Sequence, residues 1–554
     1  MKNTKKLLFG ASATTLLAVA ALTGCGGKSG GGIDEYDSQG RLILNLANVY
    51  FTSNDDKLVF DGTDRYTEFL NEKFNVKIQP SGYSYEDWDE QVSVAMKTYD
   101  IDDNIHFDLK SYNFGKTYAD WASKTLIRAL PTDLSRWPEF KKMIDNISNI
   151  DKLKIDGKLY GIPIANDITN INKDFSNFTY VYRRDILKAI DEEELKKDAN
   201  YKPLVKENDV YTWDEFERIL RAFKAKIETK YSVLVDESWG FPSITNFYKN
   251  APHCYTVDEN GKAINNFTSP EYLEGLETAK GYVSSVYYSQ DQFSFNPNDA
   301  KSRYLGGKAY ILYDNFNVAN YTTFRKDFKN TRRDVNLEDG TAIMKVKGPD
   351  GKFALEGIEN WYSMVMFNRN LSDEKLYKIL DILDFLLSEE GTRLAVYGEK
   401  DYDYYLDEDG DVVLSDMGWE LDSNGEYPAK INGARFMRYM ATLGGDTKIM
   451  DPRTSTKTNK ESYEIIKNWE NEMEAARDAG QLRIVKEPNH IAWMTTARKD
   501  ADTFSNLKAA NRTVLQYCFP AKQGGIQDID GYKAKFNTVS WNTILDQINA
   551  KLGK

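Results

Sequence analysis

The chain has 554 residues, of which 41% are hydrophobic and 28% are charged, proportions that are ordinary for a globular protein. The roughly 520 residues that follow an N-terminal leader and tether are too many for one hydrophobic core, so we expect at least two lobes. The formal net charge of −13 argues against nucleic acid as a partner, because phosphate contacts need clustered lysine and arginine side chains.

The chain begins with the pattern of a secretion signal. Three lysines precede an apolar stretch, so we predict a signal peptide over residues 1–24. The last residues of this stretch and the one after it, Leu-Thr-Gly-Cys, resemble a bacterial lipobox, in which Cys25 is acylated and becomes the mature N-terminus. The glycine-rich residues 25–40 would then tether the protein to the membrane. Plain secretion with cleavage at the small residues is the alternative.

The first elements after the tether predict an α/β fold. Residues 42–46 have the composition of a strand, apolar residues recur at helical spacing over 66–74, and residues 76–78 predict a second strand. Two strands joined by a helix are expected to be parallel, with the helix covering the sheet. In open parallel sheets ligands bind at the carboxyl ends of the strands, so polar and aromatic residues there are candidate site residues.

The stretch 152–163 predicts a turn that is followed by a break in the pattern. Asp156-Gly157 is the signal of a type I′ hairpin turn, and alternating apolar residues flank it. Gly161 frees the backbone, whereas Pro163 fixes φ and removes a hydrogen-bond donor. The stretch is therefore either an ordinary surface hairpin or a passage from one packed layer to another.

Further along, the sequence predicts well-capped helices between buried strands. Thr212 and Glu215 form a capping box at the start of a helix. Ser269 is an N-cap that is followed by proline at the first helical position. The apolar runs 309–313 and 364–367 predict buried strands.

Residues that could carry catalysis or bind a metal do not form a known motif. The three histidines lie far apart without metal-ligand spacing, and Cys-x-x-Cys does not occur. No Gly-x-Ser-x-Gly elbow follows a predicted strand, since this pattern occurs only at residues 27–31 in the glycine-rich tether. The acidic loop 405–416 matches a calcium loop only in part, and a hairpin is favoured there. We predict no catalytic residue, no metal site and no cofactor. A glycoside hydrolase needs only two carboxylates, which a chain with 85 acidic residues does not exclude.

Short motifs follow one another along the chain in a characteristic order. They are the Leu-Thr-Gly-Cys tetrad and the segments 156–163, 182–187, 212–216, 258–272, 307–309, 387–391 and 397–410. This series resembles the bacterial extracellular solute-binding lipoproteins of sugar ABC importers, and most closely the oligosaccharide-binding branch called LplA-like. One departure is the usual Gly-Asp/Glu-Leu-Pro-Asp-Ile stretch, which is represented only by residues 106–109.

The resemblance implies an α/β, two-lobed, periplasmic-binding-protein-like clamp with an interlobe cleft and multiple hinge crossings. The implied division is 41–165 and 305–365 for lobe one, and 166–304 and 366–554 for lobe two. The stretch 152–163 then becomes the first crossing. Tyr160 would lie near the back of the cleft, and Gly161 is the candidate hinge.

Sugar recognition needs flat apolar surfaces for the C–H faces of pyranose rings and planar polar side chains for the hydroxyls. Clusters that supply both follow the ends of predicted strands and helices. The predicted ligand-binding residues are Tyr112, Asn113, Asp167, Trp239, Phe241, Asn246, Tyr313, Asp314, Asn315, Asn360 and Trp361. For any single aromatic residue, core packing is the alternative.

The resemblance further implies a monomeric, non-enzymatic binding protein on the extracellular face of the cytoplasmic membrane, anchored through Cys25. It would capture an oligosaccharide and deliver it to ABC permease subunits. Related binding proteins can carry a structural calcium ion, so calcium binding is left open by analogy alone. Two alternatives remain at this stage: a surface glycoside hydrolase or polysaccharide lyase, and a surface adhesin or peptide-binding lipoprotein.

Overall fold

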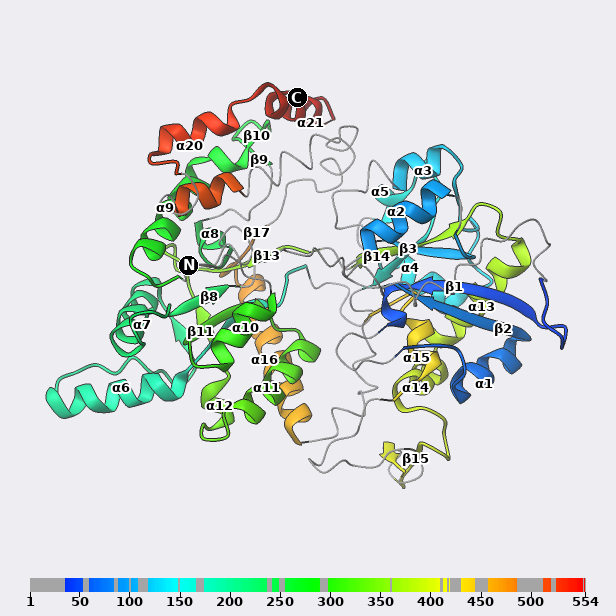
Figure 1. Ribbon diagram of the computed structural model, residues 1–554, viewed down its shortest axis with the longest axis horizontal. Coiled ribbons are helices and arrows are strands. Elements are labelled where there is room, and N and C mark those ends of the chain that lie inside the picture. Colours follow the sequence, from blue (N-terminus) through cyan, green and yellow to red (C-terminus); the bar gives the residue numbers. More distant parts are fainter. Residues whose placement is uncertain are drawn as a thin grey trace, which may run out of the picture.

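The protein folds into two lobes, which lie side by side in Figure 1. Lobe one comprises the described residues of 35–165 and 361–443, and lobe two those of 174–358 and 457–553. The computed structural model describes residues 35–52, 59–83, 88–98, 101–107, 118–147, 150–165, 174–236, 242–248, 255–288, 297–358, 361–408, 412–415, 418, 430–443, 457–485, 512–519, 525–551 and 553. Among these residues, no helix combines the length and the apolar character that a membrane crossing needs.

Lobe one is built around β14, which pairs antiparallel with β3, β4 and β5. The strands of this lobe are β1 (Leu42–Asn48), β2 (Val76–Gly82), β3 (Asn104–Phe107), β4 (Ile127–Arg128), β5 (Ile162–Ala165), β14 (Trp361–Asn368), β15 (Tyr404–Leu406) and β16 (Val412–Leu414). β1 and β2 pair in parallel, as predicted. β1 also runs alongside β3, because the Ala47 N–H donates to Asn104 Oδ1 (2.9 Å) and the Val49 N–H to His106 Nδ1 (3.3 Å).

Helices cover the lobe-one strands. They are η1 (Val49–Phe51), α1 (Arg65–Phe74), α2 (Trp88–Thr98), α3 (Ala119–Ser123), α4 (Pro138–Asp145), α5 (Ile150–Leu153), α13 (Asp373–Leu387), α14 (Glu389–Tyr397) and α15 (Gly433–Arg438). α1 begins where the Asp64 carboxylate accepts two backbone N–H groups, and it ends at Asn75 in the left-handed conformation. α13 begins at the cap Ser372 and buries seven leucine and isoleucine side chains. These caps therefore set where the two helices start.

The predicted type I′ turn is present between α5 and β5. Asp156 and Gly157 have φ angles of 49° and 75°, the positive values that this turn requires. Ile155 and Lys158 exchange both backbone hydrogen bonds, at 2.9 and 3.0 Å. The turn is thus a local feature of lobe one, and it precedes the point where the chain leaves this lobe.

Lobe two contains a five-stranded sheet in the order β7-β12-β6-β11-β8. The strands of this lobe are β6 (Phe178–Tyr182), β7 (Val210–Tyr211), β8 (Leu234–Asp236), β9 (Tyr255–Val257), β10 (Ala263–Asn265), β11 (Ile311–Asn315), β12 (Ala342–Val346), β13 (Phe353–Glu356) and β17 (Leu482–Val485). β6 runs antiparallel to β11 and β12, whereas β8 is parallel to β11 and β7 to β12. β13 and β17 form a separate parallel pair.

Helices surround the lobe-two sheet. They are α6 (Arg184–Lys197), α7 (Trp213–Lys226), α8 (Pro242–Thr245), η3 (Asn246–Tyr248), η4 (Asn266–Thr268), α9 (Pro270–Ser284), α10 (Pro297–Leu305), α11 (Val318–Thr331), α12 (Leu337–Gly340), α16 (Lys457–Asp478), α20 (Ile529–Phe536) and α21 (Val539–Lys551). The predicted capping box is confirmed: the Thr212 N–H donates to Glu215 Oε2 (2.9 Å), and the Glu215 N–H donates to Thr212 Oγ1 (3.4 Å).

The chain passes between the lobes three times, within residues 166–173, 359–360 and 444–456. On lobe one the three passages start side by side. The Ala165 N–H donates to the Ala441 carbonyl and the Leu443 N–H to the Ala165 carbonyl, each at 2.9 Å, and Ala165 also pairs with Trp361.

The first two passages also meet side by side on lobe two, whereas the third enters this lobe at the start of α16. The Ile358 N–H donates to the Asp174 carbonyl (3.0 Å), and the Gly357 N–H donates to the Val485 carbonyl (2.7 Å). The predicted two-lobed α/β fold with several crossings is therefore confirmed. The first and second crossings join neighbouring segments on both lobes, at 165 and 361 and at 174 and 358.

The division of the chain between the lobes differs from the predicted bounds. Residues 305–358, assigned to lobe one, contain β11 and β12, which pair with β6 in lobe two. Residues 366–443, assigned to lobe two, contain α13, α14 and α15, which pack against α1 and α4 in lobe one. The reason is that a periodic pattern indicates a strand or a helix but not its partner in space.

Candidate functional site

In lobe two, the end of the five-stranded sheet where β6 begins and where β8 and β11 end lies next to the crossings. We call this end of the sheet the edge of lobe two. β6 begins at Phe178, shortly after the chain enters the lobe at Asp174. In the strand register, Asn315 at the carboxyl end of β11 pairs with Phe178, and Asp236 at the carboxyl end of β8 pairs with Tyr313. The predicted ligand-binding residues of β11 therefore lie at the edge of lobe two that adjoins the crossings, as expected for carboxyl ends of strands.

Aromatic rings form a platform at this edge. The rings of Phe178 and Tyr313 stack at 25°, with centroids 5.6 Å apart, and Tyr180 lies 5.0 Å from Tyr313. Tyr313 is 4% exposed, whereas Phe178 and Asn315 are half-buried. Phe178, which the sequence reasoning missed, thus exposes an aromatic surface, and Tyr313 supports it from within the lobe.

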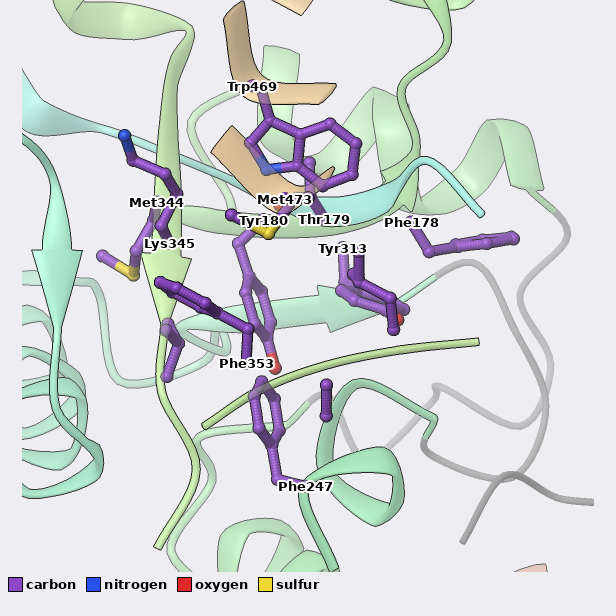
Figure 2. A pocket seen from close by; sticks show the side chains of 13 residues that line it. Phe178, Thr179, Tyr180, Phe247, Tyr313, Met344, Lys345, Phe353, Trp469 and Met473 are labelled. Carbon is purple, nitrogen blue, oxygen red and sulfur yellow. The ribbon is translucent and has the colours of Figure 1, made fainter. Parts of the chain in front are cut away.

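A small cavity lies behind the platform, between the sheet, β13 and α16 (Figure 2). Its walls include Tyr180, Phe247, Phe353 and Trp469. Its volume is about 20 Å³, which accommodates about one water molecule, whereas small-molecule sites occupy roughly 300–1,000 Å³. The cavity is too small for a saccharide and belongs to the core of lobe two.

A buried network holds the segment 242–248 against the sheet. The Tyr180 hydroxyl donates to the Ser243 carbonyl, the Ser243 and Tyr288 hydroxyls are hydrogen-bonded, and the Tyr288 hydroxyl donates to Asp236 Oδ2 (3.5 Å). Burial raises the pKa of Tyr180 and of Tyr288 well above the ordinary value, so both phenols stay neutral and able to donate. This segment is therefore a fixed part of the edge.

Asn246 lies in this fixed segment and was predicted to bind ligand. Its side chain is 1% exposed, and neither Nδ2 nor Oδ1 has a hydrogen-bond partner among the described residues. Its backbone carbonyl accepts from Arg483 Nη1 at 3.3 Å, so the residue is held through the main chain. Leaving a buried polar group unpaired costs about 1–3 kcal/mol, which makes this amide unusual for a purely structural residue.

In lobe one, the facing edge is formed by the ends of β1, β3 and β5 and the start of β14. Trp361, predicted to bind ligand, is the first residue of β14 and is 2% exposed. Ser363 lies two residues further along β14, within a stretch where the pairing with β5 is irregular, and its Oγ is 2.7 Å from His106 Nε2. His106 Nδ1 accepts the Val49 N–H, so the imidazole proton sits on Nε2 and is donated to Ser363. Burial lowers the pKa of His106 to about 3, so the ring is neutral.

Two half-buried tyrosines complete this edge. The Tyr50 ring lies 5.5 Å from His106 and 5.8 Å from Tyr439, and the Tyr439 hydroxyl accepts from Arg435 Nε (2.9 Å). Asn48 Oδ1 accepts the Tyr50 N–H (2.9 Å), whereas its fully buried Nδ2 has no partner within the described part of the chain. Sequence reasoning missed these residues, although Asn48 and Tyr50 directly follow the first predicted strand.

The other predicted site residues are distributed as follows. Tyr112, Asn113, Asp167, Trp239, Phe241, Asn360 and Cys25 lie outside the described residues. The described ones form two groups, with Asn246, Tyr313, Asp314 and Asn315 on lobe two and Trp361 on lobe one. Trp361 and the residues of β11 lie next to the crossings, but only Asn315 of the five is more than 5% exposed, so the other four pack in the core of their lobes.

The predicted hinge residues lie within lobe one. The Tyr160 N–H donates to the Tyr118 hydroxyl at 3.1 Å. A Cβ atom on Gly161 would lie 2.6 Å from the Val365 carbonyl oxygen and 2.7 Å from Met364 Cγ, so Gly161 permits close packing of the chain on β14. The chain leaves the lobe four residues later, after Ala165.

Next to the loop that partly matches a calcium site, a buried aspartate forms ion pairs with basic side chains of the same lobe. Asp403 precedes the predicted hairpin, which is present as β15 and β16. Its fully buried carboxylate accepts from Arg65, from Lys430 Nζ (2.6 Å) and from the Tyr66 hydroxyl (3.0 Å). The described residues include no group of three or more histidine, cysteine, aspartate or glutamate side chains that could hold a metal ion. Asp416 lies outside them.

The fold and the paired edges define a class of two-lobed binding proteins. The chain belongs to the bacterial extracellular solute-binding protein family, whose model matches residues 65–397, more than half of the sequence. Members of this family bind solutes and are not enzymes, so the hydrolase and lyase alternative is wrong.

Solved structures of similar proteins share this fold over nearly the whole chain. The alginate-binding protein AlgQ2, determined without calcium ion, has a TM-score of 0.60 at 15% identity, covering 92% of this chain and 98% of that chain. An extracellular solute-binding protein from Bifidobacterium longum subsp. infantis has a TM-score of 0.61 at 14% identity, covering 93% and 99%. The S. pneumoniae ABC-transporter substrate-binding protein FusA in complex with kestose has 0.57 at 14%, also covering 93% and 99%.

One relative has a higher sequence identity to this chain than these solved structures have, but over a shorter stretch. Lipoprotein LipO of Bacillus subtilis is 25% identical over 214 residues. The match covers 35% of this chain and 40% of the length of that protein.

Proposed function

We propose that this protein is the lipid-anchored, monomeric substrate-binding component of an ABC importer, which captures an oligosaccharide between its lobes and delivers it to the permease subunits. The observation that carries the proposal is the pair of edges at the crossings. Lobe one contributes the half-buried rings of Tyr50 and Tyr439, and lobe two contributes Phe178 and Asn315, so aromatic rings occur on both sides and a planar amide occurs on lobe two. These are the groups that pyranose faces and hydroxyls require.

Closure of the lobes supplies the mechanism of capture. The first two passages lie side by side at both ends, at Ala165 and Trp361 on lobe one and at Asp174 and Ile358 on lobe two, so they supply a narrow region about which the lobes would rotate while each sheet stays rigid. A saccharide that contacts both edges has more contacts in the closed form than in the open form. This differential affinity shifts the equilibrium towards the closed form, which the permease would recognise.

Similar proteins support the saccharide part of the proposal. AlgQ2 is described as alginate-binding, and FusA was determined with kestose bound. The Leu-Thr-Gly-Cys tetrad that ends at Cys25, together with the likeness to a lipoprotein, supports anchoring on the extracellular face of the membrane.

A binding screen tests this function. The mature protein is titrated with kestose, alginate oligosaccharides and a library of other oligosaccharides, and thermal shift, calorimetry and the recovered sugar are measured. We expect at least one saccharide to raise the melting temperature and to be recovered unchanged. Product formation contradicts the proposal. No response to any saccharide favours the adhesin or peptide-binding alternative.

The lipid anchor is tested separately by labelling cells with a fatty-acid analogue. The wild-type chain is expected to be labelled and to stay with the membrane, whereas Cys25→Ala is unlabelled and fails to stay there. Equal labelling of both chains contradicts acylation of Cys25.

A further inference from the structure

Helix α16 holds the segment 174–177, which leads from the first crossing to the aromatic platform of lobe two. Arg477 Nη1 donates to Asp174 Oδ1 at 3.2 Å, and the rings of Phe175 and Trp469 meet edge to face, with centroids 6.3 Å apart. α16 itself begins directly after the third crossing. A helix that follows one crossing therefore fixes the segment that follows another.

The last residue of this segment is bound by a buried acid of the same helix. Asn177 Nδ2 donates to Glu470 Oε1 at 2.9 Å, and Lys467 Nζ donates to Glu470 Oε2 at 2.8 Å. Asn177 and Glu470 are 6% and 5% exposed. The Asn177 carbonyl also accepts the N–H of Phe316, the residue that follows β11, at 3.0 Å. Asn177 thus joins α16 to the carboxyl end of β11.

A carboxylate at this buried position is not needed to cover the sheet. The neighbouring buried residues of α16, Ile466, Trp469 and Met473, belong to one apolar cluster with residues of the strands. Burial of a carboxylate costs free energy unless the group is paired, and apolar residues of similar volume often replace a buried ion pair without loss of stability. Glu470 therefore contributes a directed contact, to Asn177, that an apolar residue does not make.

The residue after Asn177 is the exposed part of the platform. Phe178 is half-buried, and its ring stacks on that of Tyr313 at 25° (Figure 2). We infer that Glu470 is a positioning residue, which holds Asn177 and thereby sets the place and tilt of the Phe178 ring that contacts the saccharide. The inference rests on the proposed function and extends it to a residue that does not itself touch the saccharide. Binding groups need such supporting hydrogen bonds, because they work only within about 0.5 Å of their productive place.

The test compares Glu470→Ala with Glu472→Ala, a control on the same helix. Glu472 accepts from Lys345 at 2.5 Å, so it also joins α16 to the sheet, but through β12 and not through the segment 174–177. Calorimetry at a temperature where every variant is folded measures the Kd for kestose, for alginate oligosaccharides or for the library saccharide with the largest thermal shift. Glu470→Ala should raise the Kd about fivefold or more, and Glu472→Ala should leave it within about twofold.

Two further comparisons separate positioning from a general loss of stability. In the Phe178→Ala background, Glu470→Ala should change the Kd by less than about twofold, because the ring that Glu470 positions is absent. Glu470→Gln should keep the Kd within about twofold of wild type, because its amide oxygen still accepts from Asn177.

Asn177→Ala removes the same hydrogen bond without altering α16. It should raise the Kd as Glu470→Ala does, with the same dependence on Phe178, and it carries the test if Glu470→Ala does not fold.

The outcomes separate this inference from the proposed function. If wild type binds a saccharide and Glu470→Ala binds it equally well, the inference is wrong and the proposed function stands. If Glu470→Ala weakens binding equally with and without the Phe178 ring, its role is structural and the inference is again wrong. A wild-type protein that binds no saccharide overturns both.

Discussion

Substitution of Gly161 distinguishes a packing role from a hinge role. A packing role predicts a loss of stability with a nearly unchanged Kd, whereas a hinge role predicts weaker binding with normal stability. It lies directly before β5, and a Cβ atom there would lie 2.6 Å from the Val365 carbonyl oxygen and 2.7 and 2.8 Å from Cγ and Sδ of Met364. The methionine side chain can move, but the carbonyl belongs to β14, which pairs with β5 at this point. Gly161→Ala therefore overpacks lobe one and should lower the free energy of unfolding by about 1–3 kcal/mol.

The assay for this prediction combines urea denaturation with calorimetric titration of a saccharide that binds. Because Gly161 lies inside lobe one, Gly161→Ala should change the Kd by less than about threefold. Gly281→Ala is the control, since its Cβ meets no atom within 4 Å and the helix should gain about 0.5–1 kcal/mol. A Kd raised tenfold or more with normal stability would refute this reasoning and would make Gly161 the hinge that the sequence suggested.

Three further predictions concern the hairpin anchor, the platform and the buried histidine. Asp403→Asn should cost about 3 kcal/mol of unfolding free energy without changing the Kd, because it leaves Arg65 and Lys430 without their shared carboxylate; a cost below about 1 kcal/mol contradicts this. Phe178→Ala should weaken saccharide binding, whereas Tyr310→Ala, half-buried at the opposite end of the same sheet, should not; equal Kd values for both variants argue against the platform. His106 has a pKa of about 3 in the folded protein and about 6.5 when unfolded, so the unfolded state binds the extra proton. Stability is therefore lost as pH falls from about 6.5 towards 3, by up to about 1.4 kcal/mol per pH unit, and His106→Gln should show a shallower decline in urea melts; parallel profiles contradict this.

Local features of the fold were predictable because their causes are local in sequence. The capping box of Thr212 and Glu215 and the turn at Asp156-Gly157 depend on neighbouring residues, and both are present. The family resemblance, carried by the order of such motifs, correctly implied a two-lobed α/β fold with several crossings. The finer assignment to the LplA-like branch stays a prediction.

Contacts between distant segments could not be predicted in the same way. β12 pairs with β6 across more than 150 residues, and nothing in the apolar pattern of either strand identifies the other, so the lobe bounds were wrong. The Asp403 cluster is similar, because this carboxylate lies in an acidic stretch while its partner Arg65 is 338 residues away. Pairing of this kind depends on the assembled fold.

The candidate site was predicted in part for the same reason. Tyr313 and Asn315 follow from the rule that ligands bind at carboxyl ends of strands, and they lie at the edge next to the crossings. Phe178 was missed because it begins a strand, and it reaches this edge only because β6 is antiparallel to β11. His106 was considered only as a possible metal ligand and was set aside because of its spacing from the other histidines. Its place as a buried neutral donor to Ser363 depends on β14 lying beside β3.

Small-angle X-ray scattering of the mature protein, with and without a saccharide identified by the screen, tests the central claim most directly. We expect the radius of gyration to decrease when the saccharide binds, because the two edges close on it, and we expect the saccharide to be recovered intact. A radius of gyration that is unchanged at saturating saccharide would contradict capture between the lobes.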